Sequence, residues 1–141
     1  MGARGDPVVR GYYSERERPP MPCVVVRVYT PTRRRSIEVE AKVDTGFSGD
    51  LLLAIDEYLR LGLNLYESYE GALGVIAGGY SVELRASRAI VKLGGVEFEC
   101  KVYTFPLATK SLLGRGILNR VRAVLDAPRG AVELYLNRAR R

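Results

Sequence analysis

The fold is decided by one short stretch of this chain, Val43-Asp44-Thr45-Gly46-Phe47-Ser48-Gly49. It follows residues 37–43, where apolar and charged side chains alternate with period two, the pattern of a half-buried β-strand. Asp44 therefore stands where a strand ends. Thr45 supplies a hydroxyl that can lock a turn, and Gly46 lets other backbone come close because it has no Cβ. The same tripeptide also makes ordinary turns, so its context has to decide between a turn of purely structural importance and a turn that carries a catalytic carboxylate.

The chemistry that suits this turn is peptide hydrolysis by paired carboxylates. Without a metal or a nucleophile, hydrolysis needs a base to activate water and an acid to protonate the carbonyl oxygen. Two carboxyl groups that share one proton do both, because like charges a few ångströms apart do not both ionise cheaply. The chain contains a single Asp-Thr-Gly. Catalysis of this kind therefore requires a two-fold homodimer in which Asp44 meets its symmetry mate.

A second stretch carries the resemblance to a known family. Residues Leu112-Leu113-Gly114-Arg115-Gly116-Ile117-Leu118-Asn119 place two apolar residues and a glycine before a short helix. Together with the run from Val43 to Leu53 and a helix ending at Leu61-Gly62-Leu63, they make the chain resemble the small clan AA aspartic proteases of archaea and bacteria, relatives of the retropepsins. The resemblance covers about residues 23–136.

This resemblance implies an all-β fold, a retropepsin-like closed acid-protease barrel with one or two short helices and a flap hairpin. It also implies roles for particular residues. The implied catalytic group is Asp44, with Thr45 and Gly46 in the same turn; the implied substrate contacts are Phe47, Ser48 and the flap residues Ala77, Gly78 and Gly79; the implied support of the turn is Leu113, Gly114 and Arg115. Retroviral enzymes pair their helix arginine with an acidic residue where this chain has Ser48, so Asp50 is the substitute partner that we consider for Arg115.

The remaining pattern predicts short strands and turns. Residues 73–76 and 80–86 predict the flap hairpin, and residues 89–93 and 96–103 predict another across Gly94-Gly95. Asp56 is expected to cap a helix that Gly62 ends, and a second helix is expected over residues 115–121. Final strands are expected at 123–125 and 132–136. Residues 1–22, rich in Gly, Pro and alternating charge, predict a flexible N-terminal arm before a protease domain at 23–141.

Composition excludes several classes of site. The chain has 141 residues, no histidine and two cysteines, Cys23 and Cys100. A zinc site with the usual ligands is nearly excluded, as are nucleophiles that need a histidine base, so we expect no metal and no cofactor. No apolar run is long enough to cross a membrane and no signal-peptide core is present, so a cytoplasmic protein is expected.

Two other functions remain open from the sequence. A non-catalytic module on the same fold could hold an extended peptide by strand-like pairing without cutting it. The net charge of +6 would suit a nucleic-acid-binding barrel. Its arginines are scattered and do not alternate with aromatic residues, which disfavours that choice. The family's dimers are sealed by terminal strands, so residues 132–136 and the strand at Cys23 are candidate interface elements.

Overall fold

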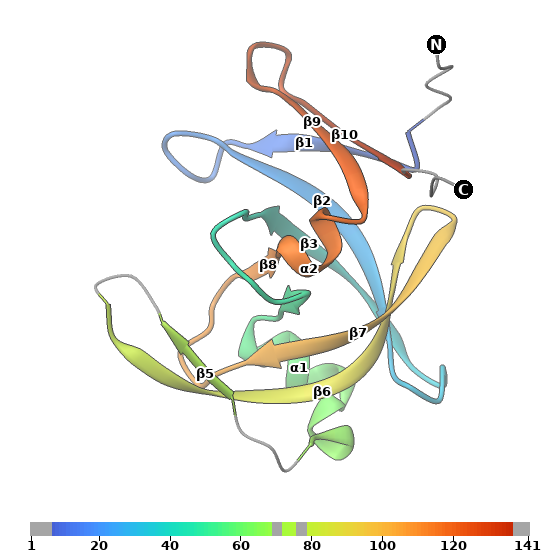
Figure 1. The fold of residues 1–141 in the computed structure, drawn as a ribbon, viewed down its shortest axis with the longest axis vertical. Coiled ribbons are helices and arrows are strands. Elements are labelled where there is room, and N and C mark those ends of the chain that lie inside the picture. The colour runs from blue at the N-terminus through green and yellow to red at the C-terminus, as the bar shows by residue number, and fades with distance from the viewer. Residues whose placement is uncertain (1–6, 69–71, 76–78, 137–141) are drawn as a thin grey trace.

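A computed structural model describes residues 7–68, 72–75 and 79–136 of the chain. In these parts it has ten strands and two short α-helices (Figure 1). The strands are β1 (Val9–Ser14), β2 (Met21–Tyr29), β3 (Ser36–Val43), β4 (Leu51–Leu52), β5 (Ala72–Val75), β6 (Ser81–Leu93), β7 (Val96–Thr104), β8 (Ser111–Leu113), β9 (Val121–Asp126) and β10 (Ala131–Leu136). The helices are α1 (Ile55–Leu61) and α2 (Arg115–Leu118), with 3₁₀ turns η1 (Leu63–Tyr66) and η2 (Ala127–Arg129).

The sheet closes on itself to form a barrel. Its strand order is β5-β6-β7-β4-β8-β3-β2-β1-β10-β9, and β6 also pairs with β2. Strands β2, β3, β8, β4, β7 and β6 therefore make a closed ring, which removes the exposed edges of these strands. The fold-class prediction, an all-β closed barrel with short helices, is confirmed.

Alternating side chains fill this barrel as the sequence predicts. In β3, Val39, Ala41 and Val43 are buried, while the charged residues between them are more exposed. Strand β7 repeats the pattern, with Phe98 and Cys100 pointing inward. Because successive residues of a strand point to opposite faces, the apolar residues of each strand fill the core and the charged residues between them face the solvent.

The two helices differ in detail from the expectation. Helix α1 begins one residue before Asp56, its N-cap is Ala54, and Asp56 makes no capping bond but lies in the first turn. The expected end is confirmed, because Gly62 adopts the left-handed conformation with φ 86° and donates its N–H to the carbonyl oxygen of Leu59. Helix α2 is a single turn that ends at Leu118, since the chain enters β9 at Val121.

The N-terminal segment contains a strand where the sequence predicted a flexible arm. Strand β1 pairs with β2 on one side and with β10 on the other. Gly11 makes this possible, because a Cβ there would lie 2.1 Å from the carbonyl oxygen of Cys23. The glycines and prolines of residues 1–22 suggested loose structure. Strand β1 is nevertheless held by hydrogen bonds to β2 and to the distant β10, and the local sequence does not reveal this pairing. Residues 9–14 are therefore part of the sheet.

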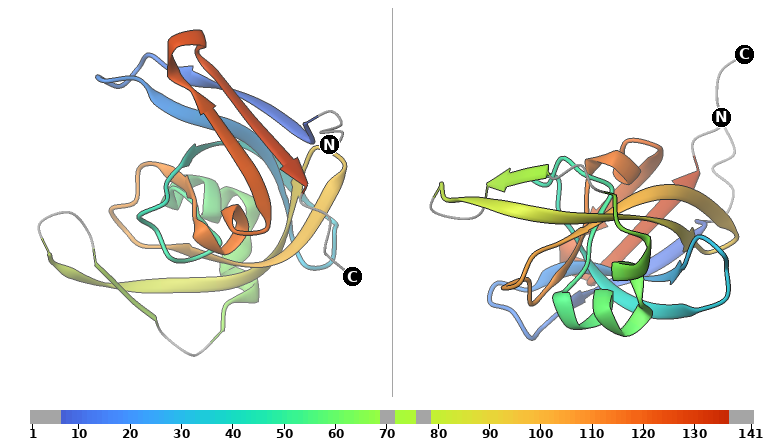
Figure 2. Two further views of the ribbon diagram at one scale, coloured as in Figure 1. Left: turned by 45° about the horizontal axis from the view of Figure 1, so that its top comes forward. Right: turned by 90° about the horizontal axis from the view of Figure 1, so that it is seen from below.

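The C-terminal hairpin and the flap hairpin were both expected. Strands β9 and β10 pair through the turn at residues 127–130, where Gly130 has φ 63°. Strand β10 is hydrogen-bonded on both sides within its own chain, and the edge strands of the described sheet are β9 at one end and β5 at the other. Strands β5 and β6 form the predicted flap hairpin, which projects from the barrel (Figure 2).

The described residues include no helix long and apolar enough to span a bilayer.

Candidate active site

The Asp44 turn links two strands that flank a third. Strand β8 lies between β3 and β4, parallel to β3 and antiparallel to β4, and residues 44–50 connect these two neighbours. The Asp44 N–H donates to the carbonyl oxygen of Leu113 at 3.0 Å, which fixes the start of the turn on β8. Within the turn, Gly46 N–H donates to Asp44 Oδ1 at 2.8 Å. This bond orients the carboxylate and leaves its other oxygen available to a ligand.

A network of backbone hydrogen bonds holds the rest of the turn against α2. The N–H groups of Gly114, Arg115 and Gly116 donate to the carbonyl oxygens of Asp50, Phe47 and Gly49 at 2.9, 2.9 and 3.0 Å. These donors lie at the first turn of α2, where N–H groups have no partner inside the helix. The backbone N–H groups at the start of α2 therefore find acceptors in the Asp44 turn. Leu113, Gly114 and Arg115, which were predicted to support this turn, all take part in these backbone bonds.

Glycine is needed where this contact is tightest. A Cβ on Gly114 would lie 2.2 Å from the carbonyl oxygen of Gly49 and 2.5 Å from Cδ2 of Phe47. A Cβ on Gly116 would lie 1.9 Å from Oδ1 of Asp50. All three separations are below any van der Waals contact, so α2 comes this close only because Gly114 and Gly116 carry no side chain.

An open cleft of about 720 Å³ begins at Asp44. Its lining comes from the turn, from the β5–β6 hairpin and from the segment before β8. Of the described residues that line it, Asp44 alone carries a carboxylate. The apolar lining residues Leu73, Val75 and Leu107 are 79, 73 and 79% exposed, so much apolar surface of the cleft faces solvent. An apolar surface of this kind is typical of a binding groove.

The predicted substrate-contacting residues divide into three groups. Phe47 and Ser48 line the cleft, and the ring of Phe47 packs edge-on against Tyr103 with centroids 6.1 Å apart. Gly79 has φ 82° and is exposed at the end of the hairpin, outside the cleft lining. Ala77 and Gly78 lie outside the described residues. Thr45 is exposed beside Asp44 and is not among the residues that line the cleft.

Arg115 does not pair with Asp50, the substitute partner considered from the sequence. Asp50 Oδ2 accepts the Lys101 N–H at 3.0 Å, and its other oxygen packs over Gly116. Arg115 is exposed and lines the cleft, and its side chain makes no ion pair or hydrogen bond with any residue that the structure describes. The carboxylate of Asp50 is thus used to tie β7 to the turn.

The segment before β8 was not recognised from the sequence. Its residues Phe105, Leu107, Ala108, Thr109 and Lys110 form one wall of the cleft. No motif or periodicity marks them, and only the pairing of β8 between β3 and β4 brings them beside Asp44. As for metals, the part of the chain with described structure contains no cluster of three or more His, Cys, Asp or Glu side chains.

Comparison with known proteins identifies the fold. No protein-family model matches this sequence, and no curated protein matches it either. A retropepsin-like aspartic protease from Rickettsia conorii aligns with a TM-score of 0.60 and 17% identity over 90% of this chain and 89% of that one. EIAV protease complexed with the inhibitor HBY-793 aligns with a TM-score of 0.53 and 23% identity over 70% of this chain and 86% of that one.

The fold is retropepsin-like. In this retropepsin-like chain the two stretches recognised in the sequence, at residues 43–49 and 112–119, lie in contact through the bonds between α2 and the Asp44 turn. At these identities the likeness establishes the architecture and leaves activity to be argued from the residues of the site.

Proposed function

We propose that two copies of this chain form an aspartic endopeptidase, each contributing one Asp44 carboxylate to a shared dyad. The observation that carries this proposal is the placement of Asp44. It lies on a turn fixed by backbone bonds to β8 and α2, and it is the single carboxylate among the described residues of the cleft. The retropepsin-like fold supports the same interpretation.

The reaction needs both copies. One carboxylate, ionised, takes a proton from a water molecule held between the pair, while the other, protonated, donates its proton to the peptide carbonyl oxygen. The water oxygen bonds to the carbonyl carbon and gives a tetrahedral diol. The C–N bond then breaks as the dyad gives its proton to the leaving nitrogen and takes a proton from one hydroxyl of the diol, which becomes the new carboxyl group and leaves the dyad in its shared-proton state. A single Asp44 cannot be acid and base in the same step.

The surroundings of Asp44 agree with a two-fold partner. Thr45 is exposed next to it, and the 2.8 Å bond from Gly46 to Oδ1 leaves the second oxygen open. A peptide in the cleft would lie between the Asp44 turn and the apolar β5–β6 hairpin, with Leu73, Val75 and Val82 along one side. An extended peptide suits a groove bordered by strands.

The direct test is Asp44→Asn, assayed on a mixture of peptides by mass spectrometry. We expect cleavage to be lost, while gel filtration and urea unfolding stay as in the wild type. The matched control is Asp56→Asn, since Asp56 is exposed in the first turn of α1 and is not among the residues that line the cleft. Cleavage that persists in Asp44→Asn would refute the assignment.

A mixing experiment tests the shared dyad itself. When subunits of wild type and Asp44→Asn exchange freely in equal amounts, about one quarter of the dimers are fully wild type. Specific activity should therefore fall to about one quarter, whereas an independent site on each chain would leave about one half. The pH profile should be bell-shaped, because one carboxylate of the pair must be ionised while the other is protonated. If wild type and Asp44→Asn both bind peptides and neither cleaves them, the chain is a peptide-binding module.

A further inference from the structure

Two cations in the cleft are not neutralised by its one carboxylate. Lys110 and Arg115 line the cleft together with Asp44, and neither lies within 4.0 Å of an Asp44 oxygen. The other lining residues described by the structure are uncharged, so the cleft lining itself has one more positive than negative side chain. A mostly apolar cleft with surplus positive charge favours a ligand that is apolar with an acidic group.

Lys110 shares its only acidic partner with another lysine. Its Nζ lies 3.1 Å from Glu17 Oε1, and the other oxygen of Glu17 faces Lys42. Lys42 is the more buried of the two, with a side chain 13% exposed against 57% for Lys110. One carboxylate does not neutralise two ammonium groups, so Lys110 keeps donors and charge for a ligand.

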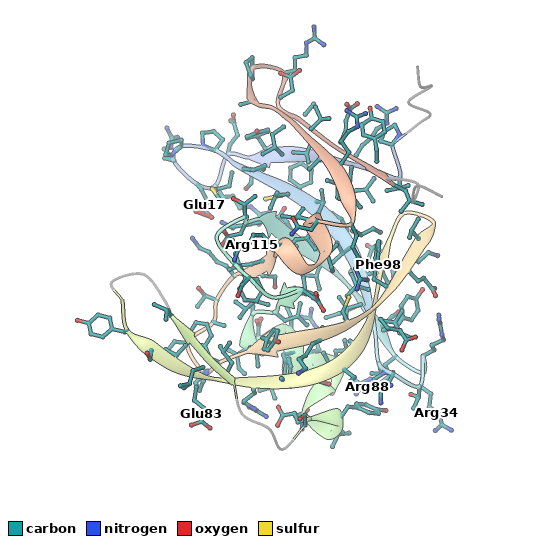
Figure 3. All side chains as sticks on the ribbon, viewed as in Figure 1. Glu17, Arg34, Glu83, Arg88, Phe98 and Arg115 are labelled. Carbon is teal, nitrogen blue, oxygen red and sulfur yellow. The ribbon has the colours of Figure 1, made fainter. Side chains whose placement is uncertain are left out.

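Two further carboxylates, those of Glu40 and Glu57, lie with Lys110, Lys42 and Arg16 in a neighbouring pocket, outside the cleft lining. Glu57 accepts the Ser111 hydroxyl at 2.7 Å, and Glu40 accepts the hydroxyl of Tyr12. Arg115 has no acidic partner among the residues that the structure describes. Figure 3 shows Arg115 on α2 and Glu17 on the turn after β1.

The positions of the two cations suggest how a peptide would meet them. Lys110 comes directly before β8 and Arg115 follows it, with Leu112 of β8 lining the cleft between them. A three-residue strand is roughly 10 Å long. The two cations therefore serve different positions of an extended peptide, on either side of an apolar subsite.

We propose that Lys110 and Arg115 make this cleft select apolar peptides that carry an acidic side chain. This inference rests on the proposed function only in taking the cleft as the peptide site. Exposed ion pairs contribute up to about 1 kcal/mol, so each cation should favour Glu over Gln in a peptide by up to about fivefold.

The preference is measured first on the Asp44→Asn protein, whose binding does not depend on cleavage. Fluorescence anisotropy gives the ratio of affinities for apolar peptides that differ only by Glu or Gln at one position, scanned along the peptide. We expect a three- to fivefold preference for Glu at one or two positions, weakened by added salt because the pairs are exposed. In Lys110→Gln/Arg115→Gln the ratio should fall to about one, and Lys110→Glu should favour Lys-containing peptides.

The matched control is Arg34→Gln, which removes an exposed arginine of the β2–β3 turn outside the cleft lining (Figure 3). It should leave the ratio unchanged. Equal binding of Glu and Gln peptides by the parent protein, or an unchanged preference in the double variant, would overturn the inference. If a variant fails to fold, the salt dependence of the parent ratio decides: a ratio that does not weaken with salt counts against it. Cleavage by wild type without acidic preference would refute this inference alone, whereas acidic preference without any cleavage would refute only the endopeptidase.

Discussion

Gly114→Ala tests whether the contact between α2 and the Asp44 turn sets the geometry of the site. The new Cβ would lie 2.2 Å from the carbonyl oxygen of Gly49. Since carbon and carbonyl oxygen rarely approach closer than about 3.3 Å, the turn and the helix must separate by about 1 Å. Gly114 has φ −99°, which alanine adopts freely, so the effect is steric and not a backbone preference.

The magnitude follows from what this movement strains. The hydrogen bonds from Gly114 to Asp50 and from Gly116 to Gly49 span the same contact at 2.9 and 3.0 Å. Overpacking of a tight interior costs about 1–3 kcal/mol, and each weakened hydrogen bond costs about 0.5–1.5 kcal/mol. We therefore expect a loss of about 2–6 kcal/mol in the free energy of unfolding. Under the proposed function, displacing the Asp44 carboxylate by about 1 Å should also lower kcat by about a hundredfold.

The assay is urea unfolding followed by circular dichroism, with peptide cleavage measured on the folded fraction. The matched control is Gly95→Ala in the β6–β7 turn. A Cβ there meets nothing within 4 Å, and the residue does not have a positive φ. This control should change the free energy of unfolding by less than about 0.5 kcal/mol. If the two alanine variants are equally stable and equally active, the close contact does not set the geometry of the site.

Three further predictions concern the scaffold. Gly11→Ala should lower the free energy of unfolding by about 1–3 kcal/mol, because the new Cβ would lie 2.1 Å from the carbonyl oxygen of Cys23. An unchanged urea midpoint would mean that β1 does not contribute to the folded sheet. Tyr58→Phe should cost about 1–2 kcal/mol in the same assay, because the buried Tyr58 hydroxyl donates to Glu67 at 2.8 Å, and an equally stable variant would contradict this. Burial, with a smaller contribution from Asp50, raises the pKa of the Cys100 thiol to about 12. At pH 8 Cys100 should therefore react with Ellman's reagent at a rate limited by unfolding, and rapid labelling of the native protein would refute this.

Much of the fold could be predicted because its signals are local. The period-two alternation of β3 and β7 assigns each side chain to one face from the sequence alone. Gly62 and Gly130 mark a helix end and a turn because few other residues adopt a positive φ. The predicted start of α1 was wrong, because Asp56 lies in the first turn and makes no capping bond. An acidic side chain is favourable both as the N-cap and in the first turn, so the sequence did not distinguish the two positions.

The sequence motif pointed to residues that lie at the cleft, and it gave no sign of the residues that reach the cleft through the sheet pairing. Asp44, Phe47 and Ser48 line the cleft as expected. The wall around Lys110 carries no motif, and it reaches the cleft only because β8 inserts between β3 and β4.

The sequence by itself determined that this chain has one Asp-Thr-Gly turn, that glycines stand in and near the motifs at residues 43–49 and 112–119, and which side chains of β3 and β7 face the core. These properties depend on residue type and on neighbours a few positions away. Only the tertiary structure decided that β1 joins the sheet, that Asp50 binds the backbone of β7 instead of Arg115, and that two cations share the cleft with Asp44. The physical reason is that these contacts join residues far apart in the chain, where many partners satisfy the same charge or backbone group and packing alone selects one.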